Sequence, residues 1–307
     1  MEILYVNSNQ KIKLENNCMA LGYFDGLHLG HLSLLKEVKK IAKENNIKSS
    51  LMTFDKHPKE LFADAKYPYL TTLDDKIKLL KELEFDYLII VHFNEEFSKV
   101  LPEEFIQEYI VNLNVQHVVC GFDYHFGRFG KGNIDVLEQN ATKYEVTVMS
   151  QKMYQDYKIS STYIKELLHQ GNISLVNELL QRNYCITGEV IHGYQRGKKE
   201  LGFATANVAY ENYVTPEIGV YATKVIISDK VYYGMTSIGY NPTFGDLQKP
   251  SLEVHIFDFD EDIYGEIISV EFVMLLRGEI RFTSKEALIE QLHKDQIDIQ
   301  EYFKENV

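Results

Sequence analysis

Two histidines stand three residues apart in a segment that also carries glycines. His28 and His31 lie in GYFDGLHLGH, which begins at Gly22 and separates a short apolar run from an amphipathic pattern. A helix that starts here offers free N–H groups to a phosphate, and Gly26 and Gly30 let the phosphate approach the backbone. Two imidazoles at this place can donate hydrogen bonds to phosphate oxygens as negative charge builds during transfer. Ten histidines can form such a pair by chance, and a zinc pair would need a third ligand nearby, so the context of strand, glycines and helix carries the inference.

A row of hydroxyl side chains, Ser160, Ser161 and Thr162, precedes a second helical pattern that contains Lys165. Hydroxyl and N–H groups at a helix start can hold phosphate, and a basic residue one turn further in adds charge. By itself such a row is more often an ordinary N-cap cluster. The loop 121–127 places aromatic residues between glycines after a buried strand pattern, which suits either a planar ring in a cleft mouth or a turn with core aromatics.

The second half of the chain carries a different set of polar residues. Between Gly188 and Val208, glycines and basic residues fit a phosphate-handling loop after a strand, although a run of this kind is usually a solvated hairpin tip. Thr205 and Asn207 alternate on an extended segment and so point the same way, and their oxygens, together with phosphates, suit Mg²⁺. Glu253 lies in an alternating strand, where a carboxylate is most often solvated.

The elements that must position these residues change character along the chain. In the first part, strand-like and helix-like patterns alternate, which favours a mostly parallel sheet with helices on both faces. We expect strands over 18–22, 49–54, 86–93, 115–122 and 146–150, and helices over 32–46, 73–85, 103–114 and 161–171. From residue 184 onward the apolar runs are short, β-branched and bounded by turns, which favours an antiparallel barrel or sandwich. A final helix is expected over 284–303, with Ser284 as its N-cap.

Length, net charge and cysteine content exclude several classes of protein. The 307 residues are comfortable for two domains, which we place at 1–181 and 182–307. A net charge of −13 argues against wrapping nucleic acid but not against binding nucleotides, since a phosphate site needs only local donors. Three scattered cysteines without a CxxC pair argue against disulfides and a structural zinc site. No stretch reaches 18 apolar residues and the N-terminus has no signal-like apolar region, so we expect a cytoplasmic protein that does not bind membranes.

The first half resembles the nucleotidyltransferase superfamily, and within it the FAD synthetase branch. HLGH, at His28–His31, resembles the HxGH box, and Ile159–Lys165 resembles an ISSTxIR stretch with Lys165 in place of the usual arginine. FDKHP, LTTL and GFDYHFG, at 54–58, 70–73 and 121–127, resemble three further elements of that branch. The resemblance implies adenylyl transfer with His28 and His31 as catalytic residues. It implies ATP binding by Gly22, Phe24, Asp25, Gly30, Ser160, Ser161, Thr162 and Lys165, and flavin binding by Phe54, His57, Pro58, Asp123 and Phe126.

The second half resembles the riboflavin kinase module. GFATAN, at Gly202–Asn207, resembles GFPTAN with Ala204 in place of proline, while 241–245 and 253–265 resemble the NPTFG loop and the strand motif ExHIxDFxxDxYG. Arg277, Phe282 and the last helix resemble the ending of that module. The resemblance implies Glu253 as the catalytic base and Thr205 and Asn207 as ligands of Mg²⁺. It implies binding of ATP or its phosphates by Gly188, His192, Arg196, Gly197, Gly202, Thr205 and Asn207, and of flavin by Asn241, Thr243, Phe244 and Arg277.

Over nearly the whole chain, the ordered motifs resemble the bacterial bifunctional riboflavin kinase/FAD synthetase family. The resemblance implies an α/β, Rossmann-like nucleotidyltransferase domain with a parallel sheet, followed by an antiparallel β-barrel with a terminal helix. The kinase would pass the γ-phosphoryl group of ATP to riboflavin, giving FMN, and the adenylyltransferase would join FMN to AMP, giving FAD and pyrophosphate. Lys165 and Ala204 leave a single-activity FAD synthetase with an inactive barrel as one alternative. A non-catalytic flavin-sensing protein is a second alternative, and the complete HxGH box and Glu253 count against it. The oligomeric state is left open.

Overall fold

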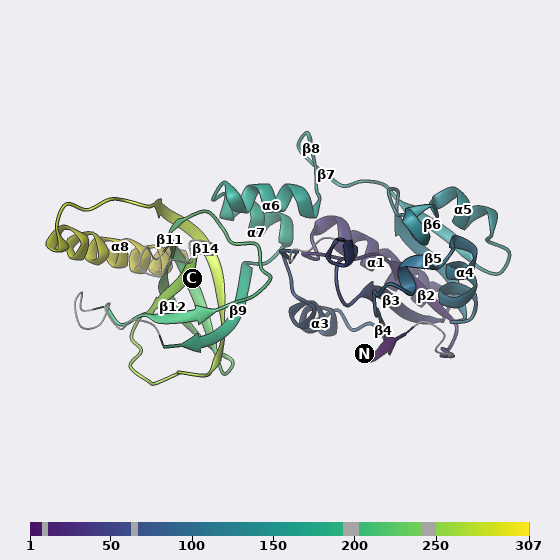
Figure 1. The fold of residues 1–307 in the computed structure, drawn as a ribbon, viewed down its shortest axis with the longest axis horizontal. Helices are drawn as coiled ribbons and strands as arrows, with labels where there is room; N and C mark the ends of the chain where they lie inside the picture. The colour runs from purple at the N-terminus through teal and green to yellow at the C-terminus, as the bar shows by residue number, and fades with distance from the viewer. Residues whose placement is uncertain (8–11, 63–66, 193–202, 241–249, 307) are drawn as a thin grey trace. The chain divides into compact units, whose positions relative to one another are not determined.

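The computed structural model describes residues 1–7, 12–62, 67–192, 203–240 and 250–306 (Figure 1). The chain divides into two compact units, Met1–Ser161 and Thr162–Val307. This division groups the helices that follow residue 161 with the second unit. The predicted domain boundary between residues 181 and 182 lies after those helices and stays a prediction.

The first unit is built on a parallel six-stranded sheet with the strand order β1-β4-β3-β2-β5-β6. Its strands are β1 (Glu2–Val6), β2 (Asn17–Leu21), β3 (Lys48–Phe54), β4 (Tyr87–Val91), β5 (Val115–Gly121) and β6 (Glu145–Met149). β2 pairs with β3 on one side and with β5 on the other, so the histidine segment leaves an inner strand. The chain adds β3 and β4 on one side of β2 and then β5 on the other, and ligands of open α/β sheets bind at such a switch point.

Helices cover both faces of this sheet, which confirms the predicted layers. The two faces alternate along β2: Cys18 and Ala20 pack on one side, and Met19 and Leu21 on the other. The first side is covered by α1 (Leu29–Glu44) and α3 (Leu73–Glu82). The second is covered by α4 (Pro102–Ile106), the π-helix η2 (Gln107–Val111) and α5 (Ile134–Gln139). The unit also contains α2 (Pro58–Phe62), the 3₁₀ turns η1 (Phe97–Lys99) and η3 (Arg128–Gly130), and the short hairpin β7 (Met153–Tyr154) and β8 (Tyr157–Lys158).

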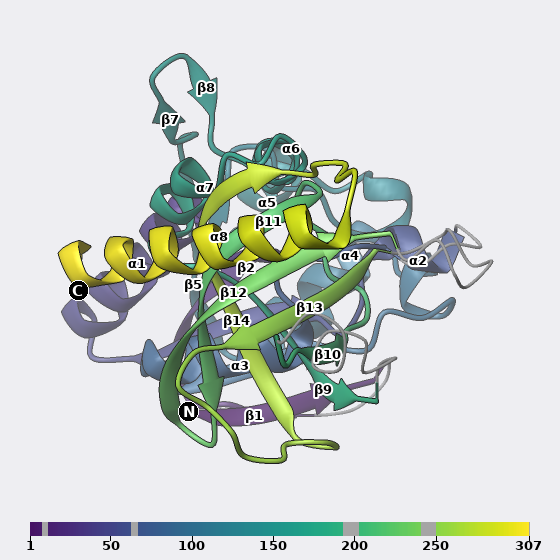
Figure 2. The ribbon, with the colours of Figure 1, turned by 90° about the vertical axis from the view of Figure 1, so that its left-hand side faces the viewer.

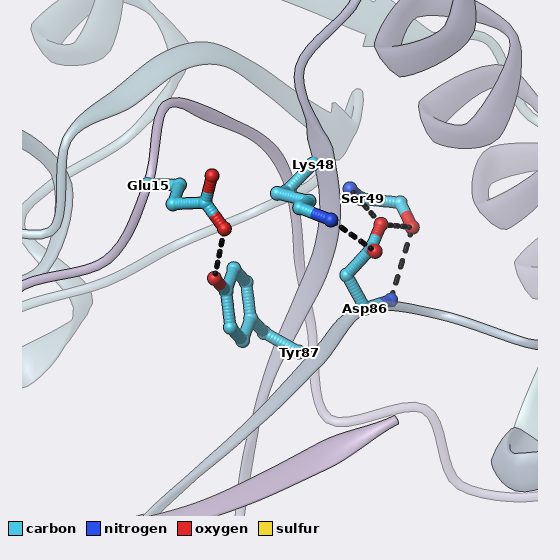
Figure 3. A network of polar contacts seen from close by, with 5 residues as sticks. All are labelled: Glu15, Lys48, Ser49, Asp86 and Tyr87. Carbon is cyan, nitrogen blue, oxygen red and sulfur yellow. Dashed lines mark hydrogen bonds and ion pairs between the residues drawn. The ribbon is translucent and has the colours of Figure 1, made fainter.

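A polar network ties β3 to β4 at their amino-terminal ends (Figure 3). The Asp86 carboxylate accepts hydrogen bonds from the backbone N–H and the hydroxyl of Ser49, at 2.8 and 2.9 Å, and pairs with Lys48 at 3.3 Å. Beside it, the hydroxyl of Tyr87 donates to Glu15 at 3.3 Å. Burial alone would raise the pKa of the Asp86 carboxyl, but the hydrogen bonds from Ser49 and Lys48 outweigh burial and lower the pKa. The network joins strand starts, so it lies at the end of the sheet away from the switch point.

The second unit contains a closed antiparallel barrel with the strand order β10-β13-β12-β11-β14-β9. Its strands are β9 (Tyr184–Ile191), β10 (Ala206–Ala209), β11 (Gly219–Ile227), β12 (Lys230–Gly239), β13 (Ser251–Ile256) and β14 (Ile267–Gly278). The pairing of β9 with both β10 and β14 closes the ring, which decides for a barrel over a sandwich. The helices α6 (Ser161–His169) and α7 (Ile173–Leu180) precede the barrel.

The last helix, α8 (Lys285–Asn306), crosses the outside of the barrel (Figure 2). Its buried residues Ile299 and Phe303 share a cluster with Val220, Ala222 and Met235 of the strands. The helix begins where the sequence predicts, because the Ser284 hydroxyl caps it by accepting the backbone N–H of Ala287 at 3.1 Å. The terminal helix is therefore part of the fold of the second unit.

Candidate functional sites

A tight turn carries the chain from β2 to α1 in the first unit. Phe24 (φ 57°), Gly26 (φ 83°) and Leu27 (φ 44°) all adopt left-handed backbone conformations within four residues. Such conformations persist in residues other than glycine only where the surroundings impose them. The turn is held through Asp25, whose carboxylate accepts the backbone N–H groups of Leu70 and Thr71 at 2.9 and 3.2 Å. The predicted ATP-binding Asp25 therefore shapes the turn from a buried position.

The two histidines stack on each other at the start of α1. Their ring centres are 3.7 Å apart with an angle of 16° between the planes, and the edge of His31 meets Phe24 at 5.2 Å. His28 is the N-cap of the helix: its Nδ1 accepts the backbone N–H of His31 at 3.4 Å. A Cβ atom on Gly30 would lie 3.1 Å from the His28 ring, so glycine makes room for the imidazole. The predicted pair is therefore brought together by the fold.

The two histidines are largely shielded from solvent. His28 is only 5% exposed and His31 is half-buried, because the turn folds back over them. Burial, followed by the proximity of His28 and Lys76, lowers the pKa of the His31 imidazole well below its usual value. Its buried Nδ1 has no hydrogen-bond partner among the described residues. A neutral imidazole with an unused polar atom can bind a phosphate or another polar ligand group.

The predicted phosphate-binding row lies at the start of α6. Ser161 is the first residue of this helix, and its hydroxyl donates to the backbone carbonyl of Asp25 at 2.8 Å. Ser161 thereby joins the helix start to the turn after β2. Thr162 is exposed, and Ser160 and Lys165 are half-buried in the same first turns. The structure therefore links this row to the histidine segment through one hydrogen bond of Ser161.

The predicted flavin-binding residues of the first unit fall into two groups. Phe54 and Phe126 belong to the core: Phe54 packs on Phe93 at 5.4 Å, and Phe126 is buried against Phe105 at 4.9 Å. In the 121–127 loop, the Phe126 ring is therefore a core aromatic, which is one of the two interpretations that the sequence allows for this loop. Asp123 is exposed instead, and its carboxylate pairs with Lys158 at 2.6 Å.

His57 lies in an aromatic cluster that the sequence analysis did not anticipate. Its ring stacks on Tyr67 at 3.9 Å and meets Tyr23 edge-on at 4.9 Å, and Tyr69 lies 6.1 Å from Tyr23. Pro58 follows His57 as the first residue of α2. These rings come from the ends of β2 and β3 and from the segment before α3, and only the fold brings them together. Tyr69 is buried and the other three residues are half-buried. Partly accessible aromatic rings suit stacking of a planar ring.

In the second unit, the register of the barrel brings two predicted site residues face to face. Asn207 of β10 is the direct partner of Glu253 of β13. The neighbours Leu252 and Val254 are buried, whereas Glu253 is only half-buried, so Glu253 points to the opposite face of β13. His255 shares that face, and its Nδ1 lies 2.7 Å from the backbone carbonyl oxygen of Ala204. The carbonyl of Ala204, which stands where the GFPTAN motif has proline, is therefore fixed by a hydrogen bond.

A pocket of about 520 Å³ adjoins Ala206 and Val254, the sequence neighbours of this pair. It is lined by Thr205 and Ala204, by Val190, Val254 and Ile256 of the barrel strands, and by the loop 259–264. The predicted residue His192 packs against Tyr264 of that loop, with ring centres 3.8 Å apart. Arg196, Gly197, Gly202, Asn241, Thr243 and Phe244 lie outside the described residues. The described part of the pocket is thus large enough for a nucleotide-sized ligand.

Two further predicted residues have a structural explanation. A Cβ atom on Gly188 would lie 2.2 Å from the carbonyl oxygen of Ala209, so the close approach of β9 and β10 requires glycine there. Arg277 binds the buried carboxylate of Asp295 through Nε at 2.9 Å and Nη2 at 2.7 Å. Its guanidinium group thereby fastens α8 to β14.

The donor atoms of the second unit fit a hard cation that arrives with phosphates. The described residues contain no group of three or more His, Cys, Asp or Glu side chains arranged to hold a metal. Thr205 and Asn207 offer neutral oxygens, and Glu253 stands across from Asn207. Mg²⁺ usually takes only one or two protein ligands and completes its shell with water and substrate phosphates. The oxygens of Thr205 and Asn207 therefore suit Mg²⁺ bound together with ATP.

A parallel sheet with a histidine pair at its switch point, followed by a barrel with an Asn–Glu pair beside a pocket, defines a two-module ATP-using transferase. Residues 10–163 match the family model described as FAD synthetase, and residues 180–303 match the one described as riboflavin kinase. The chain belongs to the family of bifunctional riboflavin kinase/FMN adenylyltransferases. It accordingly acts in flavin biosynthesis, converting riboflavin to FMN and FMN to FAD with ATP as co-substrate.

Individual relatives agree with this assignment. The bifunctional riboflavin kinase/FMN adenylyltransferase of Bacillus subtilis (strain 168) is 42% identical, over 93% of this chain and 92% of the relative. That of Listeria monocytogenes serovar 1/2a is 40% identical, over 94% and 93%. A solved Streptococcus pneumoniae chain named as a macrolide-efflux protein is 30% identical with a TM-score of 0.88, covering 97% of this chain and 99% of that one. In the described part of the present chain, no helix is long and apolar enough to span a membrane.

Both matched modules count against the two alternatives, a single-activity FAD synthetase and a non-catalytic flavin sensor. The predicted family, fold class and reaction are confirmed. The roles of individual residues stay predictions and are taken up below.

Proposed function

We propose that the turn after β2 and the first turn of α1 hold ATP for adenylyl transfer to FMN. The stacked pair of His28 and His31 at the switch point carries this proposal. A phosphate oxygen of FMN attacks the α-phosphorus of ATP, the bond from that phosphorus to the bridging oxygen breaks, and pyrophosphate leaves. The two imidazoles donate hydrogen bonds to the oxygens that gain negative charge. Ser160, Thr162 and Lys165 bind the departing phosphates, and His57 and Asp123 flank the flavin.

We propose a separate phosphoryl-transfer site on the barrel, with Glu253 as the general base. Its position across from Asn207, on the face of β13 whose His255 contacts the Ala204 carbonyl next to Thr205, supports this role. The ribityl hydroxyl of riboflavin loses its proton to Glu253 while its oxygen attacks the γ-phosphorus of ATP, and ADP leaves. Thr205 and Asn207 would hold Mg²⁺ with the ATP phosphates, where the ion neutralises phosphate charge. Catalysis then rests on positioning and charge neutralisation.

Measuring both activities in each variant of the full chain tests both assignments. His28→Ala and His31→Ala should each lower FAD formation from FMN by about 10²–10³, the usual effect of removing a transition-state donor. Glu253→Gln should lower FMN formation from riboflavin by about 10²–10⁴ and leave FAD formation unchanged. Each activity serves as the control for the other, and circular dichroism checks folding because His28 is buried. Near-normal FAD formation in both histidine variants would remove the adenylyl assignment, and near-normal phosphorylation in Glu253→Gln would remove the kinase assignment.

We further propose that the protein works in the cytoplasm. All three cysteines are free, and two of them are buried. Free thiols are the rule in reducing compartments.

A further inference from the structure

A lysine is buried beneath the turn that carries the histidine pair. Lys76 of α3 is 1% exposed, and lysine is rarely buried to this extent unless its charge finds partners. Its Nζ donates to the backbone carbonyl of Tyr23 at 2.7 Å and to the hydroxyl of Thr53 at 3.4 Å. The same Nζ lies 4.2 Å from the centre of the Tyr23 ring, a cation–π distance. The ammonium group thus directs its contacts at one residue, Tyr23, and at the neighbouring strand end.

Tyr23 is the last residue before the left-handed backbone conformations of the turn begin at Phe24. Its carbonyl is held from below by Lys76 and also accepts the hydroxyl of Thr53 at 2.9 Å. Asp25, two residues later, is also fixed by hydrogen bonds. Its carboxylate accepts the backbone N–H groups of Leu70 and Thr71, and its carbonyl accepts the hydroxyl of Ser161. The turn therefore has separate anchors at Tyr23 and at Asp25, and of these two the Tyr23 anchor includes a buried cation.

We infer that Lys76 is a positioning residue for adenylyl transfer: its ammonium group fixes the Tyr23 carbonyl and thereby the turn that presents His28 and His31 to ATP. This inference rests on the proposed role of the histidine pair. A shift of about 1 Å in a catalytic group can cost about 10²-fold in rate. An anchor at the start of a strained turn controls such a shift, because the four residues between Tyr23 and His28 include three left-handed conformations.

The protonation of Lys76 gives this role a measurable signature. Burial is the main cause that lowers the pKa of the ammonium group to about 8, and the nearby Asp25 carboxylate opposes it. The other titratable groups that face Lys76 are Tyr23, whose pKa burial raises, and His31, whose pKa is lowered. The Lys76 cation is thus present below about pH 8 and is lost above it. A neutral amine is a weaker hydrogen-bond donor than an ammonium ion, so the anchor weakens as the pH rises.

The test compares pH profiles of FMN adenylylation in the full chain, from about pH 6.5 to about 9.5. Lys76→Met keeps the length of the side chain and removes the charge. At neutral pH it should lower kcat/KM by about 10- to 10²-fold. It should also abolish the alkaline decline near pH 8 that the wild type shows. The matched control is Lys78→Met, in the same helix, whose side chain is 64% exposed. It should keep both the rate and the decline.

A second variant covers the case in which Lys76→Met does not fold. Thr53→Val keeps the cation and removes one of its oxygen partners, so it should move the alkaline decline to lower pH. An unchanged decline in either folded variant, or a normal rate in Lys76→Met, overturns the inference, since a merely structural lysine would alter stability and not the profile. His28→Ala in the same assay separates the two proposals. If it retains activity, the histidine assignment fails. If it is inactive while Lys76→Met behaves as wild type, only the role of Lys76 fails.

Discussion

Replacing Asp295 by asparagine should destabilise the second unit. The burial of the Asp295 side chain allows us to estimate the loss in the free energy of unfolding. The Asp295 side chain is 1% exposed and the Arg277 side chain 16%, and two guanidinium nitrogens bind the carboxylate. Removing one partner of a buried ion pair costs about 3–5 kcal/mol, because the other charge is left buried without compensation. Asparagine keeps the shape and one acceptor oxygen, and Arg277 retains some contact with water. We therefore expect a loss near the lower limit, about 3 kcal/mol in the free energy of unfolding.

Urea unfolding of the full chain, followed by circular dichroism, measures this loss. With a urea dependence of about 1–3 kcal/mol/M, the transition of the barrel unit should move down by roughly 1–3 M. FMN adenylylation at each urea concentration reports the first unit and should keep its midpoint. Glu301→Gln, an exposed carboxylate-to-amide change in the same helix, should shift the barrel by no more than about 0.5 kcal/mol. If Asp295→Asn behaves like Glu301→Gln, the pair does not fasten α8 and the reasoning is wrong.

Three further outcomes follow from the second unit. Ala204→Pro should speed riboflavin phosphorylation or lower the KM for Mg-ATP about two- to fivefold, because proline restricts the chain before Thr205; steady-state kinetics that show no gain would argue against a loosened segment. Gly188→Ala should destabilise the barrel by at least about 1–3 kcal/mol in thermal unfolding, since its Cβ would meet the Ala209 carbonyl, whereas Gly278→Ala, with open space around it, should not. A fragment from Thr162 to Val307 should fold alone and be more stable than one from Arg182, because Asn177 of α7 hydrogen-bonds the backbone of Tyr184 and Phe272 at 2.8 and 2.9 Å; equal thermal midpoints would contradict this.

The strands and helices that bury an apolar face were predictable from the sequence. β2 and β4 are buried along their whole length and are largely apolar, because helices cover both of their faces. β1 was missed because it is a partly exposed edge strand, in which Tyr5 is 60% exposed. α1 begins earlier than its apolar pattern, at Leu29, because a histidine serves as its N-cap where serine, threonine, asparagine or aspartate would be expected.

The candidate sites were predictable where a local motif carries them. The stacked histidines and the Asn207–Glu253 pair could be expected, because each residue stands in a recognisable segment. Lys76 follows the LTTL segment by three residues, but only the fold places its ammonium group under Tyr23. The low pKa of His31 likewise depends on burial in the fold and, in part, on Lys76, which is distant in sequence.

The strand order of the first unit also determines when each strand can pair during synthesis of the chain. Within the described sheet, β1 pairs with β4 alone, and β2 has its partners in β3 and β5. At about 5–20 residues per second, the ribosome needs roughly 4–16 s to extend the chain from the end of β1 to the start of β4. During that interval β1 has no strand to join, and its apolar side chains are open to a chaperone or to a neighbouring nascent chain. The barrel, in contrast, must wait for β14 before its ring can close on β9.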